Sequence, residues 1–259
     1  MSTNLQIGIV GLPNVGKSTL FNAITKAGAE AANFPFCTIE PNVGVVEVPD
    51  HRIYDLAAMF KPKKTTPAFT RFVDIAGLVA GASKGEGLGN QFLSHIRETD
   101  AIAHVVRCFE DGNITHVEGS IDPVRDMDII NTELCLADLE SVDKKKTKTA
   151  KLAQAGIKQA KADLPVLEKV YDALQNGTPA RALTLSEDDL EVLKELNLIT
   201  LKPVLYVLNM AEDDIADPLA NKFVQAASAE AEKEGAKWVP ISAEIEEEVS
   251  ELDGEEAKA

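Results

Sequence analysis

Short apolar runs alternate with longer amphipathic segments along most of the chain. The runs are four to seven residues long, which suits buried strands, and apolar residues at helical spacing separate several of them. The six runs span residues 7–10, 43–48, 71–77, 103–109, 203–208 and 238–241. Strands that alternate with helices predict an α/β domain with a mostly parallel sheet.

From residue 122 to residue 174 the pattern is that of helices alone. Apolar residues recur at 129, 130, 134, 136, 139 and 142, and again at 164, 167, 171 and 174. A basic stretch, 144–151, separates the two sets. The spacing fits either a helical hairpin with this stretch at its tip or two ordinary helices packed on the sheet. We favour the hairpin, and expect a nucleotide-binding domain in two parts, 1–122 and 201–259, around an insertion at 123–200.

Composition and charge narrow the class of protein. The 259 residues suffice for one large α/β domain or for one domain with an insertion. A formal net charge of −16 argues against nucleic-acid binding through bulk charge, so we expect no DNA partner, and RNA only at a local basic patch. No apolar run approaches the ~18 residues of a membrane span. The absence of such a run leads us to expect no membrane partner. The three cysteines, Cys37, Cys108 and Cys135, lack paired spacing, so we expect reduced thiols in a cytoplasmic protein.

The clearest chemical signal lies in residues 11–19, which read Gly-Leu-Pro-Asn-Val-Gly-Lys-Ser-Thr. This matches G-x-x-x-x-G-K-[ST], the P-loop, and it follows an apolar strand and precedes a helical pattern, the context in which the motif cradles phosphates. Lys17 would reach the β- and γ-phosphates, which makes it a catalytic candidate, and the Ser18 hydroxyl would bind Mg²⁺. The expected phosphate contacts are Asn14, Val15, Gly16, Lys17, Ser18 and Thr19.

Two later elements fit a switch protein built on this loop. Thr38 could supply a hydroxyl oxygen to Mg²⁺ and the γ-phosphate, or it could be an ordinary loop threonine. Asp74 and Gly77 form D-x-x-G at the end of a strand, where Asp74 would hold Mg²⁺ and the N–H of Gly77 would meet the γ-phosphate. The glycine-dense stretch 81–89 then fits either a moving switch segment or a surface loop.

Two further elements stand at strand ends, Asn-Met-Ala-Glu at 209–212 and Ser-Ala-Glu at 242–244. The five elements in this order resemble the GTPase-type switch domains of the translation-factor class, whose fourth element is N-K-x-D. The chain departs from that element. Together with Asn-Phe-Pro-Phe-Cys-Thr-Ile-Glu-Pro-Asn at 33–42, the stretch 81–91 and Leu-Lys-Pro at 201–203, the whole chain resembles the Obg-related ATPase family called YchF.

The resemblance implies a doubly wound P-loop NTPase fold with a helical insertion. It also implies a cytosolic, Mg²⁺-dependent ATPase that binds ribosomes, hydrolyses ATP slowly and acts in translation or stress control. Members of the family carry a further C-terminal domain of the TGS type, and the sequence stops at residue 259, before it. The lysines of 144–151 are the best local basic patch for ribosomal RNA, although they could equally serve only to keep an exposed tip soluble.

Hydrolysis needs a group that positions water. In Ras-like proteins a glutamine follows D-x-x-G, but here Leu78 stands there and can neither donate nor accept a hydrogen bond. His116 is our candidate, supported by the family resemblance, and the alternative is a surface histidine. Asn14 matches an asparagine that lets some switch proteins place K⁺ near the phosphates, or it only shapes the loop.

Base choice depends on the fourth and fifth elements. An aspartate in N-K-x-D accepts two hydrogen bonds from guanine, and Glu212 is one methylene too long to hold the same position. Met210 replaces a lysine with an uncharged apolar cover, while Asn209 keeps the amide that braces the pocket. We predict that ATP binds more tightly than GTP; a GTPase and a nucleotide-gated binding module are the alternatives. The expected base-side contacts are Asn209, Met210, Glu212, Ser242 and Ala243.

Overall fold

A sheet with the strand order β2-β3-β1-β4-β5-β6 forms the centre of the molecule. The computed structural model describes residues 5–29, 43–75, 88–112, 116 and 119–252. The strands in these residues are β1 Leu5–Val10, β2 Val43–Glu47, β3 Phe69–Asp74, β4 Ala101–Arg107, β5 Val204–Asn209 and β6 Lys237–Ile241. β2 runs antiparallel to β3, and the other neighbouring pairs are parallel. The α/β prediction and the mostly parallel sheet are therefore confirmed.

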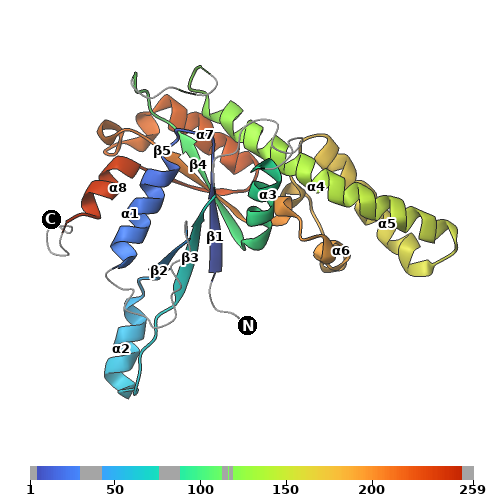
Figure 1. The fold of residues 1–259 in the computed structure, drawn as a ribbon, viewed down its shortest axis with the longest axis horizontal. Coiled ribbons are helices and arrows are strands. Elements are labelled where there is room, and N and C mark those ends of the chain that lie inside the picture. Colours follow the sequence, from blue (N-terminus) through green and yellow to red (C-terminus); the bar gives the residue numbers. More distant parts are fainter. Residues whose placement is uncertain (1–4, 30–42, 76–87, 113–115, 117–118, 253–259) are drawn as a thin grey trace.

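Helices lie on both sides of this sheet (Figure 1). They are α1 Lys17–Ala29, α2 His51–Phe60, α3 Leu88–Glu98, α4 Pro123–Gln154, α5 Lys158–Gln175, α6 Glu187–Leu193, α7 Lys222–Lys233 and α8 Ala243–Val249. Helix α1 packs beside α8, and α7 packs against α4 and β5. Fully buried side chains such as Ile9, Ile102 and Leu208 fill the core between the helices and the sheet.

Helices α4 and α5 form an antiparallel hairpin that extends away from the sheet (Figure 1), as the sequence predicted. It has a core of its own, in which Val142, Leu167 and Val170 are completely buried. The chain turns at Gly156, whose φ of 89° is a left-handed conformation that suits glycine. The expectation that residues 144–151 form the tip was wrong, because these residues belong to the last turns of α4.

Two sets of buried polar contacts attach the hairpin to the sheet domain. The carboxylate of Asp138 on α4 accepts hydrogen bonds from the main-chain nitrogens of Ile199 (3.1 Å) and Thr200 (2.7 Å) and pairs with Arg97 on α3 at 3.1 Å. Asn131 on α4 donates to the hydroxyl of Tyr206 on β5 at 3.1 Å. Because Asp138 is fully buried, each of its oxygens needs such a partner, and the contacts fix the base of the hairpin relative to the sheet.

The structure bears on two expectations from the sequence, that the cysteines are reduced and that no segment spans a membrane. Cys108 and Cys135 are free and buried, and burial raises the pKa of each thiol to about 12, so both stay protonated at neutral pH. Cys37 lies outside the described residues. No helix in the described ranges combines the length and the apolar character that crossing a membrane requires.

Candidate nucleotide-binding site

The P-loop joins the end of β1 to the start of α1, as the sequence predicted. A Cβ on Gly11 would lie 2.5 Å from the main-chain oxygen of Val105 on β4, and one on Gly16, whose φ is 96°, would collide with the side-chain nitrogen of Asn209. Asn14 adopts the left-handed region with φ of 62°, which asparagine tolerates better than most residues. The P-loop thus passes so close to β4 and to Asn209 that positions 11 and 16 need glycine.

Lys17 begins α1 and is 8% exposed. Its Nζ donates a 2.7 Å hydrogen bond to the main-chain oxygen of Leu12, so the side chain folds back over its own loop. Burial lowers the pKa of Lys17, and the charge of Asp74 opposes this shift. An ammonium held there provides a positive charge at the mouth of the loop, beside the first turn of α1, where main-chain N–H groups point outward.

Asp74 ends β3 close to Lys17. Its Oδ1 is buried and has no hydrogen-bond partner among the described residues. Burial raises the pKa of Asp74, while the attraction of Lys17 acts in the opposite direction. A buried, incompletely satisfied carboxylate oxygen favours a cation, and Mg²⁺ is usually held by one or two protein oxygens with phosphates and water as the other ligands. Asp74 and the exposed Ser18 therefore fit a magnesium site completed by a nucleotide.

Asn209 at the end of β5 connects the loop to the base side of the site. Its Nδ2 donates to the main-chain oxygen of Val15 at 2.9 Å, and its Oδ1 accepts from the main-chain nitrogen of Ala243 at 2.9 Å. Met210, 4% exposed, donates its N–H to the oxygen of Ile241 at 2.8 Å. The structure thus brings the P-loop, the end of β5 and the start of α8 together. Ser242 is buried at this junction, and Glu212 lies exposed in the following 3₁₀ turn, Glu212–Asp214.

His116 is buried, not a surface histidine. Its Nε2 lies 2.8 Å from Oδ2 of Asp126 in the first turn of α4, and both side chains are at most 5% exposed. The other oxygen of Asp126 accepts from Arg125 at 3.1 Å. Asp126 was not predicted from the sequence, because a carboxylate ten residues away, in the first turn of a helix, follows no periodic pattern. Thr19 lies in the first turn of α1, half-buried, whereas Thr38, Gly77 and Leu78 lie outside the described residues.

The comparisons with known proteins agree with this geometry. Residues 6–134 match a family described as 50S ribosome-binding GTPase. The ribosome-binding ATPase YchF of Bacillus subtilis (strain 168) is 55% identical over 252 residues, covering 97% of this chain and 69% of that protein. The protein of the same name from Haemophilus influenzae is 56% identical over 249 residues, covering 96% of this chain and 68% of that protein. This chain belongs to the YchF family.

A solved member of the family shows the same fold. The structure of the Schizosaccharomyces pombe YchF GTPase aligns with a TM-score of 0.84 and 43% identity, covering 98% of this chain and 70% of that chain. The P-loop NTPase fold is therefore confirmed together with the family. The names of these YchF proteins differ in the nucleotide, since the bacterial relatives are named ATPases and the yeast protein a GTPase.

Proposed function

We propose that this chain is a Mg²⁺-dependent ATPase that hydrolyses ATP slowly, binds ribosomes and works as a nucleotide switch in the cytoplasm. The observation that favours ATP over GTP is the pair of hydrogen bonds made by Asn209 at the end of β5. Its two hydrogen bonds fix the end of β5 against the P-loop, so the residues that follow, Met210 and Glu212, lie where the base-reading lysine and aspartate of a GTPase would be. Neither residue can reproduce the two-point contact with guanine.

Different residues of the chain are assigned to the phosphate groups and to the Mg²⁺ ion. The N–H groups of the P-loop and of the first turn of α1 surround the β- and γ-phosphates. Lys17 exchanges its bond to the oxygen of Leu12 for a phosphate oxygen, so its charge moves little. Ser18 and Asp74 would hold Mg²⁺, with Thr38 as a further oxygen donor and the N–H of Gly77 on the γ-phosphate. Bound Mg²⁺ supplies positive charge that offsets the charge on the transferred phosphoryl group.

His116 is the residue we assign to the attacking water. Leu78 at the glutamine position offers no hydrogen bond, which accounts for slow hydrolysis. The contact with Asp126 fixes the plane of the imidazole ring, while the burial of His116 means that the ring must become accessible when nucleotide binds. Stimulation by the ribosome would act on this step.

Asn14 could help to hold a K⁺ ion, and thus a second positive charge, near the phosphates. Its left-handed backbone places an amide side chain on the exposed surface of the P-loop, where it could help to hold K⁺. A fixed cation there would stabilise charge that develops in the transition state. Turnover in K⁺ should then exceed turnover in Na⁺ at equal ionic strength, and equal rates would remove K⁺ from the mechanism.

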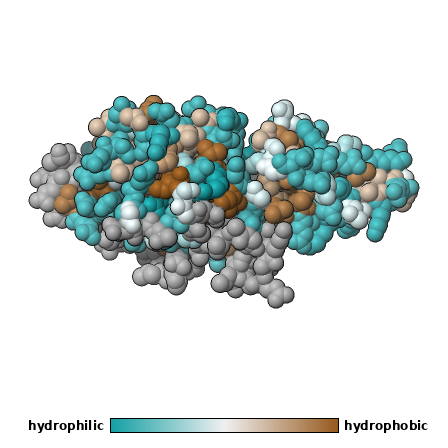
Figure 2. All heavy atoms as spheres, turned by 90° about the horizontal axis from the view of Figure 1, so that it is seen from above, coloured by the Kyte–Doolittle hydropathy of each residue, from teal (hydrophilic) through white to brown (hydrophobic). Residues whose placement is uncertain are grey.

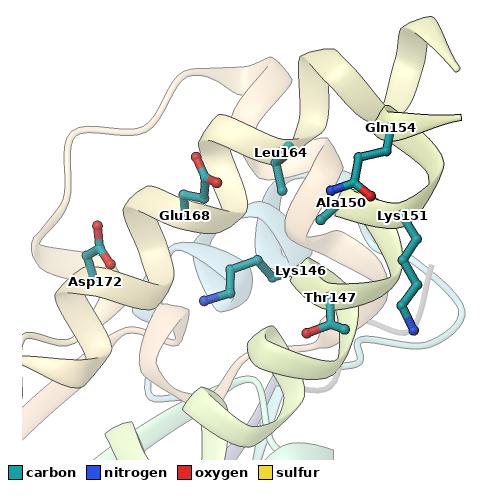
Figure 3. A pocket seen from close by; sticks show the side chains of 8 residues that line it. All are labelled: Lys146, Thr147, Ala150, Lys151, Gln154, Leu164, Glu168 and Asp172. Atoms are coloured by element: carbon teal, nitrogen blue, oxygen red, sulfur yellow. The ribbon is translucent and has the colours of Figure 1, made fainter. Parts of the chain in front are cut away.

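The lysines of α4 are the proposed contact with ribosomal RNA, but they are not equivalent. Lys144 pairs with Glu140, Lys145 with Glu195 at 2.7 Å, and Lys146 lies over the ring of Tyr171. Figure 3 shows Lys146 directed along the groove between the two helices, whereas Lys151 points away from it. The remaining pair, Lys148 and Lys151, forms no ion pair with any described residue and is available for phosphates.

The surface around these lysines is hydrophilic. Figure 2 shows mainly hydrophilic residues over the outer part of the hairpin, on the right of the view. Replacing Lys148 and Lys151 with glutamate should weaken co-sedimentation with ribosomes, most clearly at low salt, because phosphate contacts depend on salt. Lys237→Glu on the exposed edge strand β6 is the matched control for each single replacement, Lys148→Glu or Lys151→Glu. Equal loss in the control and the α4 variant would remove these lysines from the contact.

Turnover measurements test the proposed function. We expect slow ATP hydrolysis that requires Mg²⁺, and we expect its rate to increase when purified ribosomes are added. A GTPase is the second candidate, favoured by the matched family of ribosome-binding GTPases and by the name of the yeast protein. If hydrolysis stays negligible with ribosomes present while nucleotide still controls ribosome binding, the chain is a nucleotide-gated binding module, not an enzyme.

A further inference from the structure

Helix α2 connects β2 to β3 and extends beyond the end of the sheet (Figure 1). It has a well-formed start, where the side chain of Asp50 accepts from the N–H of Arg52, and its last turn closes on Lys61. Apolar residues at positions 53, 56, 57 and 60 follow the spacing i, i+3, i+4, i+7. This spacing forms one apolar face of a helix that packs against a partner.

That apolar face has no partner within the described part of the chain. No residue of α2 is buried, and Phe60 and Leu56 are 74% and 54% exposed. Met59, beside the stripe, is also 74% exposed. A helix of ten residues normally depends on burial of one face for its stability, because helix propensity alone is marginal at this length. Large apolar side chains gathered on one protrusion mark an interaction surface.

The face is also hollowed. The returning segment, residues 62–66, runs beside the helix and leaves an open groove of about 390 Å³. The groove is lined by Ile53, Leu56, Ala57, Phe60, Pro62, Lys64, Thr65 and Thr66. A shallow apolar groove beside a helix is the kind of surface that receives the apolar face of a second helix.

The charges around the groove select the partner. Lys61, Lys63 and Lys64 are exposed at one end and form no ion pair with any described residue, although the whole chain carries a net charge of −16. Two copies joined through this surface would bring the same lysines together, which disfavours a second copy. RNA would use the lysines and could stack a base on Phe60, but it would leave the aliphatic lining, Ile53, Leu56 and Ala57, unused, because RNA recognition relies on stacking and phosphate contacts.

We propose that α2 and residues 61–66 form a docking surface for a protein segment that presents an apolar helical face flanked by acidic side chains. The apolar residues of the segment fill the groove over Leu56 and Phe60, and its carboxylates pair with the three lysines. The surface is separate from the nucleotide site and from helix α4. Helices α2 and α4 extend from opposite sides of the sheet domain (Figure 1).

Two synthetic peptides of matched length test this surface. Both carry leucine at i, i+3, i+4 and i+7, and the remaining positions hold mainly glutamate in one and lysine in the other. Fluorescence anisotropy with the whole chain should show the acidic peptide binding at least about tenfold more tightly, with an affinity that falls as salt is raised. Phe60→Ser should weaken this binding by about tenfold or more. Leu219→Ser, at a residue 53% exposed elsewhere on the surface, should leave it unchanged.

Reversing the charge of the three lysines tests the choice of an acidic partner more directly than the single variant does. Changing Lys61, Lys63 and Lys64 together to glutamate should invert the preference, so that the basic peptide binds better. Equal affinity for both peptides, or no effect of Phe60→Ser, would overturn the proposal. Binding of a single-stranded oligouridylate that depends on the lysines, without binding of the acidic peptide, would assign the surface to RNA instead. Self-association abolished by Phe60→Ser would assign it to a second copy, and a large fall in Tm for Phe60→Ser would show that the face packs within the chain.

Discussion

Asn209 donates a hydrogen bond of 2.9 Å from Nδ2 to the main-chain oxygen of Val15, across 194 positions in sequence. This hydrogen bond fixes the position of the P-loop relative to the end of β5 and the start of α8, because Oδ1 of the same side chain accepts from the main-chain N–H of Ala243. In the proposed nucleotide site, the phosphate-binding and base-binding segments are therefore held by the same side chain. Its loss should affect every nucleotide, whatever the base.

Asn209→Asp keeps the size of the side chain but replaces the donor with a second acceptor facing the oxygen of Val15. The free energy of unfolding should fall by about 1–3 kcal/mol, the usual cost of leaving a buried polar group unsatisfied. The affinities for ADP, ATP and GTP should fall by similar factors. Urea unfolding and calorimetric titration measure the two effects, and a loss confined to one base would contradict the role as a brace.

Asp74→Asn removes the negative charge from the proposed magnesium site but preserves the shape of the side chain. The affinity for ATP should fall by about tenfold or more with Mg²⁺ present, since a neutral amide is a poorer ligand. In EDTA the affinity should hold or improve, because a negative charge near the phosphates has gone. An equal loss with and without Mg²⁺ would show that Asp74 acts only through folding.

His104 on β4 should make stability depend on pH. Burial lowers its pKa to about 3, with smaller contributions from the charges of Arg181 and Lys17. In the unfolded chain the pKa is about 6.5, so between these values the unfolded state binds a proton that the folded state does not. The free energy of unfolding should therefore fall as pH falls from 6.5 toward 3, by up to about 1.4 kcal/mol per pH unit.

His104→Phe should flatten this dependence. The ring of His104 lies 5.2 Å from that of Tyr206, so an aromatic replacement keeps the packing. Urea unfolding between pH 4 and 7 measures the slope. His51→Gln, at an exposed histidine of α2, is the control for removing a histidine, and an unchanged slope in His104→Phe would contradict the assignment.

His116→Ala should lower kcat by about 100-fold or more, the scale of a lost proton-transfer or water-positioning group. The affinity for ATP should stay the same, because the histidine acts on the water. Asp126→Asn should give a smaller loss of kcat, since it leaves the ring in place but weakens the contact that fixes it. Single-turnover hydrolysis, with the protein in excess of ATP and at a concentration above the Kd, measures the chemical step apart from binding. An unchanged rate in His116→Ala would remove His116 from the mechanism.

The sequence predicted the features that depend on local pattern. Six apolar runs correspond to the six strands of the described residues, and the G-x-x-x-x-G-K-[ST] spacing placed the P-loop between β1 and α1. Strand direction is a different matter, because alternation of side chains does not reveal whether a strand runs parallel to its neighbour; β2 proved antiparallel. The division of the chain at residues 122 and 200 stays a prediction.

Three features were not predicted from the sequence. The lysines of 144–151 resembled a polar tip, but lysine is a good helix former and their ion pairs, such as Lys144 with Glu140 one turn earlier, extend α4 to Gln154. Helix α2 was missed although the sequence signals it, through the capping residue Asp50 and the apolar stripe that ends at Phe60. The pairing of His116 with Asp126 depends on tertiary packing.

Calorimetric titration of the chain with ATP and with GTP, in the presence of Mg²⁺, tests the central claim most directly. Loss of the two-point charged contact with guanine corresponds to about 2–4 kcal/mol, so ATP should bind roughly 30- to 1000-fold more tightly than GTP. The double variant Met210→Lys with Glu212→Asp should shift the preference toward GTP. Wild-type chain that binds GTP as tightly as ATP would contradict the assignment as an ATPase and leave the GTPase in its place.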